Sequence, residues 1–149
     1  MRKLVLLITA VLVALAAASA LAATNGTYRG TTSQKLKMSV TVSSKLVQTV
    51  RIRWKTKDCT SAPKGYEFDS GPFFHSNTTK NPIKQSGGFF TQDAKTTAQG
   101  NGIKAVITAH VHGHFDGRNV SGNEKTSSRI DDKFGHHTCK SSVRWSAKR

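Results

Sequence analysis

AVITAHVHGHFDG, residues 105–117, is the stretch that decides the fold. Its apolar side chains recur at every second position, from Ile107 through Val111 to Phe115, with polar residues between most of them. Because successive side chains of a β-strand point to opposite faces, this period of two predicts a strand with one buried face. Asp116-Gly117 follows directly, and Asp-Gly is a strong signal for a tight hairpin turn.

The same alternation appears in three other segments, residues 36–42, 46–55 and 143–148. Turn residues separate them, and residues 23–149 show no helical spacing of apolar residues over ten or more positions. We therefore predict an all-β, single-domain antiparallel sandwich or partly closed barrel of about seven or eight short strands. The polar stretch 122–137 is expected to be an exposed edge hairpin or a loop. Residues 60–101 are expected to form long loops, with short strands at Phe73-Phe74 and Phe89-Phe90.

The N-terminus has the pattern of a secretory signal peptide over residues 1–22. A positive start is followed by a short apolar stretch and by small residues at Ala20 and Ala22, which fit the preference of the cleavage site. The alternative is an uncleaved anchor, but the leucine-rich part is shorter than the roughly 20 residues that a spanning helix needs. We expect a single exported β domain over residues 23–149, with no transmembrane segment, located outside the cell or in the cell envelope.

Two cysteines, Cys59 and Cys139, lie in the part expected to be exported. An even count in an oxidising compartment predicts one disulfide bond between them. The alternative, a reactive thiol pair, has little support because the two residues are far apart and form no C-x-x-C motif.

The composition is strongly basic. Without Arg2 and Lys3, 21 Lys and Arg residues face 8 Asp and Glu residues, which gives residues 23–149 a formal charge of +13. Such a charge favours anionic partners, among them teichoic acid, nucleic acid and sulfated polysaccharide. The simpler interpretation is that the charge only keeps the protein soluble.

Strand alternation predicts where part of this charge lies. With Val50, Ile52 and Trp54 inside, the residues between them point outward, and the same holds around Val143 and Trp145. A disulfide beside both strands would hold them close, antiparallel if they are neighbours. The expected polyanion-binding face then carries five cations and no carboxylate: Arg51, Arg53, Lys55, Arg144 and Lys148.

Three histidines, His110, His112 and His114, alternate on the strand quoted first and should share its outer face. Paired imidazoles can bind zinc or copper when a third ligand joins them, and the candidates are His75 and His136-His137. A solvated polar face is the alternative, which we favour because no carboxylate is expected beside these rings. We therefore predict no cofactor and no tight metal site; a pH-responsive face is a further option.

Carboxylates offer two close pairs. Glu67 and Asp69 could form a glycosidase-like pair, and Asp131-Asp132 could bind a cation. With eight acids in the chain, such proximity also arises by chance. No G-x-S-x-G motif and no P-loop occur. Three N-glycosylation motifs, at Asn25, Asn77 and Asn119, matter only in a glycosylating host.

Several short motifs resemble a loose group of small exported bacterial β proteins of uncharacterised function. They are a G-x-Y-x-G-x-T start at 26–32, two distant Cys, G-x-F at 113–115 and W-x-A-x-[RK] beginning at Trp145. The resemblance implies the architecture and lends no catalytic residue. We expect a non-enzymatic domain that binds anionic envelope or extracellular polymers. The alternatives are a secreted metal-dependent or hydrolytic enzyme using the His110/His112/His114 face, and a module binding a protein or small ligand.

Overall fold

Twelve β-strands make up the regular structure of residues 23–149, which are the residues that the computed structural model describes. The predicted signal peptide, residues 1–22, lies outside the described residues. The strands are β1 (Gly26–Thr32), β2 (Lys37–Ser43), β3 (Leu46–Ile52), β4 (Lys55–Thr56), β5 (Cys59–Thr60), β6 (Phe68–Asp69), β7 (Phe73–Ser76), β8 (Lys84–Ser86), β9 (Phe89–Gly100), β10 (Ile103–Asp116), β11 (Asn119–Asp132) and β12 (Gly135–Lys148).

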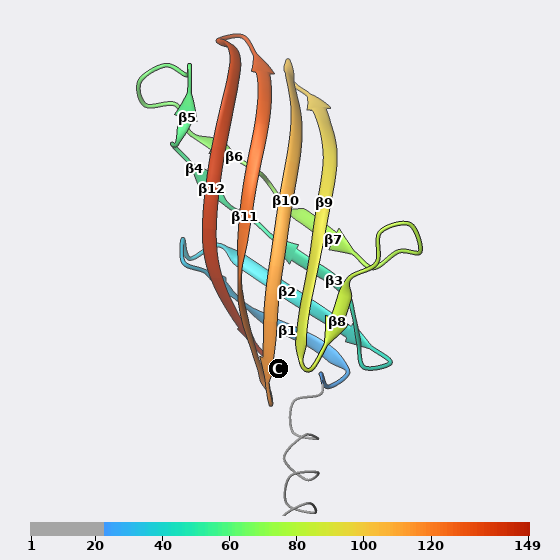
Figure 1. Cartoon of the computed structure of the whole chain (residues 1–149). Coiled ribbons are helices and arrows are strands. Elements are labelled where there is room, and N and C mark those ends of the chain that lie inside the picture. Colours follow the sequence, from blue (N-terminus) through green and yellow to red (C-terminus); the bar gives the residue numbers. More distant parts are fainter. Residues whose placement is uncertain (1–22) are drawn as a thin grey trace, which may run out of the picture.

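Ten of these strands form one antiparallel sheet that curls into a half-barrel. Its order is β7-β3-β2-β1-β12-β11-β10-β9-β8, with β5 added beside β12, and β4 pairs separately with β6. The four long strands β9–β12 stand side by side, and β1, β2 and β3 cross behind them (Figure 1). The apolar side chains of both parts meet in the space between, so the all-β prediction and the partly closed barrel are confirmed.

The predicted hairpin turn at Asp116-Gly117 is confirmed: β10 ends at Asp116, β11 begins at Asn119, and Gly117 has positive φ. Ser44 and Lys45 both have positive φ between β2 and β3, as do Asn101 and Gly102 between β9 and β10. Two successive residues with positive φ are typical of the two-residue turns whose twist matches that of the flanking strands.

The number and length of the strands differ from the prediction. There are twelve strands rather than about eight, and β9–β12 have 12 to 14 residues each. The stretch 122–137 is not an edge hairpin or a loop but forms most of β11 and the start of β12, in the middle of the sheet. The sequence concealed β11 because its inward side chains include polar residues, among them Glu124, Thr126 and Ser128.

Glycines make room for the largest core side chains. One row across the sheet pairs Phe90 with Gly113, Gly113 with Gly122, and Gly122 with Trp145. The rings of Phe90 and Trp145 stack over these glycines, with centroids 6.0 Å apart and planes 29° from parallel. A Cβ at Gly113 would lie 2.3 Å from the Phe90 ring and 2.7 Å from Trp145. The two aromatic side chains therefore fit only where two strands lack side chains.

The disulfide bond is confirmed. Cys59 and Cys139 face each other in the β5–β12 pairing, with their Cα atoms 4.0 Å apart and the bond formed. The bridge fixes the segment that leaves β4 against the middle of the last strand.

Candidate functional site

The outer face of the large sheet is the candidate functional surface. We use the name outer face for the side of β1–β3 and β9–β12 that points away from the buried core. Exposed positions alternate with buried ones along each of these strands, which sets the direction of every side chain. The cations on this face are Arg29, Lys37, Arg51, Lys95, Lys104, Lys125, Arg129, Lys140, Arg144 and Lys148.

The register shows how the predicted cations meet. Arg51 lies opposite Ser39, Ser39 opposite Arg29, and Arg29 opposite Lys148. The expectation that β3 and β12 could be neighbours is therefore wrong, because β2 and β1 lie between them. Their outward cations lie on the same side of one curled sheet and are linked through Arg29, although β3 and β12 belong to the two parts that pack against each other (Figure 1). Like charges directly opposite each other, as in Arg29 and Lys148, are destabilising unless an anion offsets them.

Two of the five predicted cations have carboxylate partners, so the expectation of a face free of acids is wrong for them. Arg53 forms two hydrogen bonds with Asp69, one from Nε to Oδ1 at 2.9 Å. The Nζ of Lys55 lies 3.0 Å from Glu67. The hydrogen bond from Arg53 lowers the pKa of Asp69 and in turn raises that of Arg53. Glu67 and Asp69 thus serve as counter-ions on β6 and the preceding loop rather than as a glycosidase-like pair.

Other acids are paired with histidines. Asp93 lies 2.8 Å from His110, Asp131 3.5 Å from His136, and Asp132 3.0 Å from His137. As a result, Arg53 and Lys55 are the only Lys or Arg residues in the described range 23–149 that form ion pairs. The outer face therefore carries positive charge that the described residues do not neutralise.

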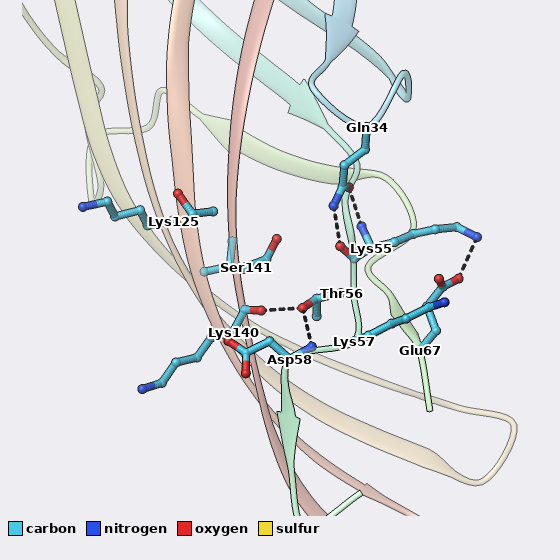
Figure 2. Close-up of a pocket in the computed structure, with 11 residues that line it drawn as sticks. Gln34, Lys55, Thr56, Lys57, Asp58, Glu67, Lys125, Lys140 and Ser141 are labelled. Atoms are coloured by element: carbon cyan, nitrogen blue, oxygen red, sulfur yellow. Dashed lines mark hydrogen bonds and ion pairs between the residues drawn. The ribbon is translucent and has the colours of Figure 1, made fainter. Parts of the chain in front are cut away.

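A groove beside β12 continues this surface (Figure 2). β12 pairs with β5 at Thr138 and Cys139 and with β1 from Trp145 onward, so residues 140–144 lie at a gap between two partner strands. The segment from Lys55 to Asp58 crosses this gap. The groove between them has a volume of about 800 Å³.

Hydrogen bonds between side chains and the backbone hold the walls of the groove in place. The Gln34 amide donates to the Lys55 carbonyl at 2.6 Å and accepts from the Lys55 N–H at 2.8 Å, and the hydroxyl of Thr56 donates to the Lys140 carbonyl. Around these fixed contacts the lining has four ammonium groups and two carboxylates: Lys55, Lys57, Lys125, Lys140, Asp58 and Glu67. The groove is thus polar and carries a net positive lining that is open to solvent (Figure 2).

The three strand histidines lie on the outer face as predicted, but their neighbours differ from the expectation. The register places Asp93 of β9 beside His110, so a carboxylate does accompany one of these rings. His112 and His114 pack against Phe89. Within residues 23–149 no group of three or more His, Cys, Asp or Glu side chains is placed to hold a metal ion.

The proposed third ligands lie elsewhere. His75 is inward on β7, 3.3 Å from the carboxylate of Glu124, and His137 is buried near the start of β12. Both residues are engaged away from the outer face. His136, the remaining candidate, is exposed on the outer face beside Asp131, but it lies six positions along β12 from the row that contains His110.

Thr91, His110 and Asp93 have the order of a hydrolytic triad, and His110 contacts Asp93 at 2.8 Å, but the hydroxyl of Thr91 is directed elsewhere. The Oγ1 of Thr91 lies 3.5 Å from His110 Nε2 and instead donates to the Val111 carbonyl at 3.0 Å. His110 is 47% exposed and Asp93 88% exposed. Nucleophilic catalysis needs a close base in a shielded site, whereas these groups lie in solvent.

The buried pair His75–Glu124 was not predicted from the sequence. Both side chains are fully buried, and burial raises the pKa of Glu124, against the opposing effect of His75. The only indication in the sequence is the alternation along the strand. Glu124 is an even number of residues from Val120 and Ile130, which are both inside, so it shares their strand face. A charged residue among polar neighbours is not recognised as inward without the core residues that flank it.

Tyr66 closes the far end of the sheet through a second polar cluster. Its hydroxyl donates to Asp132 at 2.8 Å, and His137 contacts both Asp132 and the Ser61 carbonyl at 3.0 Å. Burial and the bond to Asp132 raise the pKa of Tyr66 to about 12. Desolvation opposes ionisation of Asp132, but the hydrogen bonds from Phe134 N–H, Tyr66 and His137 outweigh it and lower its pKa. Asp132 is therefore part of a structural cluster. Of the two carboxylates predicted to bind a cation together, only Asp131 lies outside this cluster.

Replacing Tyr66 by phenylalanine is expected to cost about 1 kcal/mol at neutral pH, because one hydrogen bond to a buried carboxylate is lost. The folded-state pKa of about 12 exceeds the ordinary value of 10.0, so Tyr66 stabilises the fold fully below pH 10.0. That contribution is lost as pH rises through the folded-state value, because the unfolded chain ionises first.

Urea unfolding between neutral and alkaline pH tests this. The Tyr66→Phe protein should lack the part of the alkaline decline that Tyr66 causes. Identical alkaline declines in the two proteins would contradict the role assigned to this hydroxyl.

Comparisons with protein-family models, with curated proteins and with solved structures find no match. None of the residues from 23 to 149 belongs to a helix long and apolar enough to cross a membrane.

Proposed function

We propose that this chain is an exported, non-enzymatic β domain that binds anionic polymers through its outer face. The observation that carries the proposal is the unpaired charge: of the 21 Lys and Arg residues in the described range, only Arg53 and Lys55 have carboxylate partners. The signal-peptide pattern and the Cys59–Cys139 bond support export, because disulfides persist in oxidising compartments.

The arrangement of the cations supports a polymer rather than a single small anion. They lie along seven neighbouring strands, and Arg29 lies directly opposite Lys148 across the β1–β12 pair. A chain of phosphate or sulfate groups could contact many of these cations at once, releasing its condensed counter-ions and relieving the repulsion between Arg29 and Lys148. Binding of this kind has low sequence specificity and weakens steeply with salt.

Charge reversal on the outer face tests the proposal. The variant Arg51→Glu with Arg144→Glu should elute from a heparin column at markedly lower salt than the unchanged protein, because two outward cations become repulsive. Lys64→Glu with Lys80→Glu changes the net charge equally, in exposed loops outside the strands. This matched control should shift the elution by less than half as much.

Two outcomes would overturn the proposal. Equal shifts for the two double variants would mean that net charge alone determines retention and that the outer face is not a site. If the unchanged protein is not retained on the heparin column at physiological ionic strength, useful polyanion binding is excluded altogether. Circular dichroism of each variant checks that the sheet is intact, since Arg51 also lies over the Phe74 ring at 5.7 Å.

A further inference from the structure

Phe89 is an aromatic side chain that the fold leaves outside. In the predicted pair Phe89-Phe90, alternation buries Phe90 in the core and turns Phe89 to the outer face, where it is 49% exposed. Covering this ring with a ligand would remove a large apolar area from water, which would contribute to binding.

Phe89 does not stand alone. It lies opposite His114 in the β9–β10 register, with ring centroids 4.3 Å apart and planes 35° from parallel. His112 lies two positions before His114 on β10. Its ring centroid is 5.8 Å from that of Phe89, and the two ring planes are 32° apart. The three rings form a small aromatic platform on the outer surface of the sheet.

Cations flank this platform on the neighbouring strands. The row that contains His112 continues through Asn123 of β11 to Arg144 of β12. In the next row, His110 lies opposite Lys125. Two acids share this part of the outer face: Asp93, which is engaged with His110 at 2.8 Å, and Asp116, two positions beyond His114 at the hairpin end of β10. Flat π surfaces and unpaired positive charges are therefore side by side.

This combination selects among polyanions. Teichoic acids and sulfated polysaccharides offer charge but no aromatic rings, so charge alone would explain their binding. A single-stranded nucleic acid offers both, since its bases can stack on aromatic side chains while its phosphates contact Lys and Arg. Exposed rings on an open sheet face are a recurrent means of holding unpaired bases.

We infer that the polymer bound by the outer face is a single-stranded nucleic acid, with bases stacked on Phe89 and its histidine neighbours and phosphates on Arg144 and Lys125. The inference rests on the proposed function, because it names the ligand class of the same face. A double helix fits less well, because its bases are already stacked on one another and do not expose their faces to protein rings.

Fluorescence anisotropy with two labelled probes tests the inference: an oligothymidylate of about 15 nucleotides, the size of a typical single-strand site, and a heparin oligosaccharide. Phe89→Leu keeps an apolar side chain but removes the ring. It should weaken binding of the oligothymidylate about 5- to 100-fold, the loss expected for one stacked base. It should change heparin binding less than about twofold, because heparin has no aromatic base to stack on the ring.

Phe134→Leu is the matched control. Phe134 is 53% exposed but lies at the turn between β11 and β12, beside Tyr66 and away from the outer face. Its replacement should leave both probes unaffected. An abasic oligonucleotide of equal length should bind the unchanged protein about as weakly as the oligothymidylate binds Phe89→Leu. The Phe89→Leu variant should bind the abasic oligonucleotide as tightly as the unchanged protein does.

The possible failures are distinguishable. If neither probe binds the unchanged protein, the proposed function falls and this inference with it. If heparin binds but Phe89→Leu affects both probes equally, or neither, the nucleic-acid inference is overturned while polyanion binding stands. Tighter binding of heparin than of the oligothymidylate at equal salt, with no effect of Phe89→Leu, would identify a sulfated polymer as the ligand.

Discussion

Replacing Gly122 by alanine is expected to destabilise the protein by about 3 kcal/mol or more, at the upper end of the range for overpacked cores. A Cβ at this position would lie 2.0 Å from the backbone carbonyl oxygen of His112 and 2.5 Å from the Trp145 ring. The first contact is with backbone on the paired strand, which cannot rotate away. Relief requires β10 and β11 to separate, so ladder hydrogen bonds are lost along with the packing of Trp145.

The effect should extend beyond one contact, because Gly122 belongs to the row that seats Trp145 against Phe90 over Gly113. If Trp145 moves outward, its stacking on Phe90 is lost and β12 shifts relative to β11. Since β12 joins the long strands to β1, the two parts of the half-barrel should loosen together.

Gly100→Ala is the matched control. A Cβ at Gly100 would meet nothing within 4 Å, and its φ is not positive. The change should be neutral or stabilising by about 0.5 kcal/mol, through reduced freedom of the unfolded chain. Urea unfolding followed by tryptophan fluorescence measures both variants. Equal stability of the Gly122→Ala and Gly100→Ala proteins would show that the close strand approach at Gly122 does not constrain the fold.

Local alternation predicted the parts of the fold in which inward positions are apolar. Residues 37–42 and 105–115 form strands with the expected faces, whereas the strand predicted over 46–55 ends at Ile52, and Lys55 begins the separate strand β4. β11 escaped because inward Glu124, Thr126 and Ser128 remove the apolar signal, although they alternate as regularly as their neighbours. The outer half of β9 escaped for another reason: Thr96 and Ala98 are exposed where no strand covers them, so burial imposes no pattern.

The candidate site was predictable only as far as strand direction determines it. Alternation correctly turned Arg51, Arg144 and Lys148 outward. It could not reveal that Arg29 links these cations, because that follows from the insertion of β1 and β2 between β3 and β12. Nor could it reveal Asp93 beside His110 or Asp69 beside Arg53, because pairings between strands and loops depend on register.

Removal of the disulfide is expected to cost about 4 kcal/mol, the chain-entropy value for a closed loop of 80 residues. The bond restricts the unfolded chain far more than the folded one, because β5 is already held beside β12 by its own pairing. The variant to make is Cys59→Ala with Cys139→Ala, since Cys139 is buried and alanine introduces no polar group there.

Urea unfolding with and without a thiol reductant measures the effect. Reductant should lower the midpoint of the unchanged protein to near that of the double alanine variant, whose own midpoint should not respond. The dependence of the unfolding free energy on urea should also become steeper without the bond, because the unfolded chain expands and exposes more surface. An unchanged protein whose midpoint ignores the reductant, under conditions in which free thiols are detected, would contradict the stabilising role. Without the disulfide bond, the segment that carries Lys57 and Asp58 is held to β12 by fewer contacts. The groove beside β12 should therefore open before the rest of the sheet unfolds.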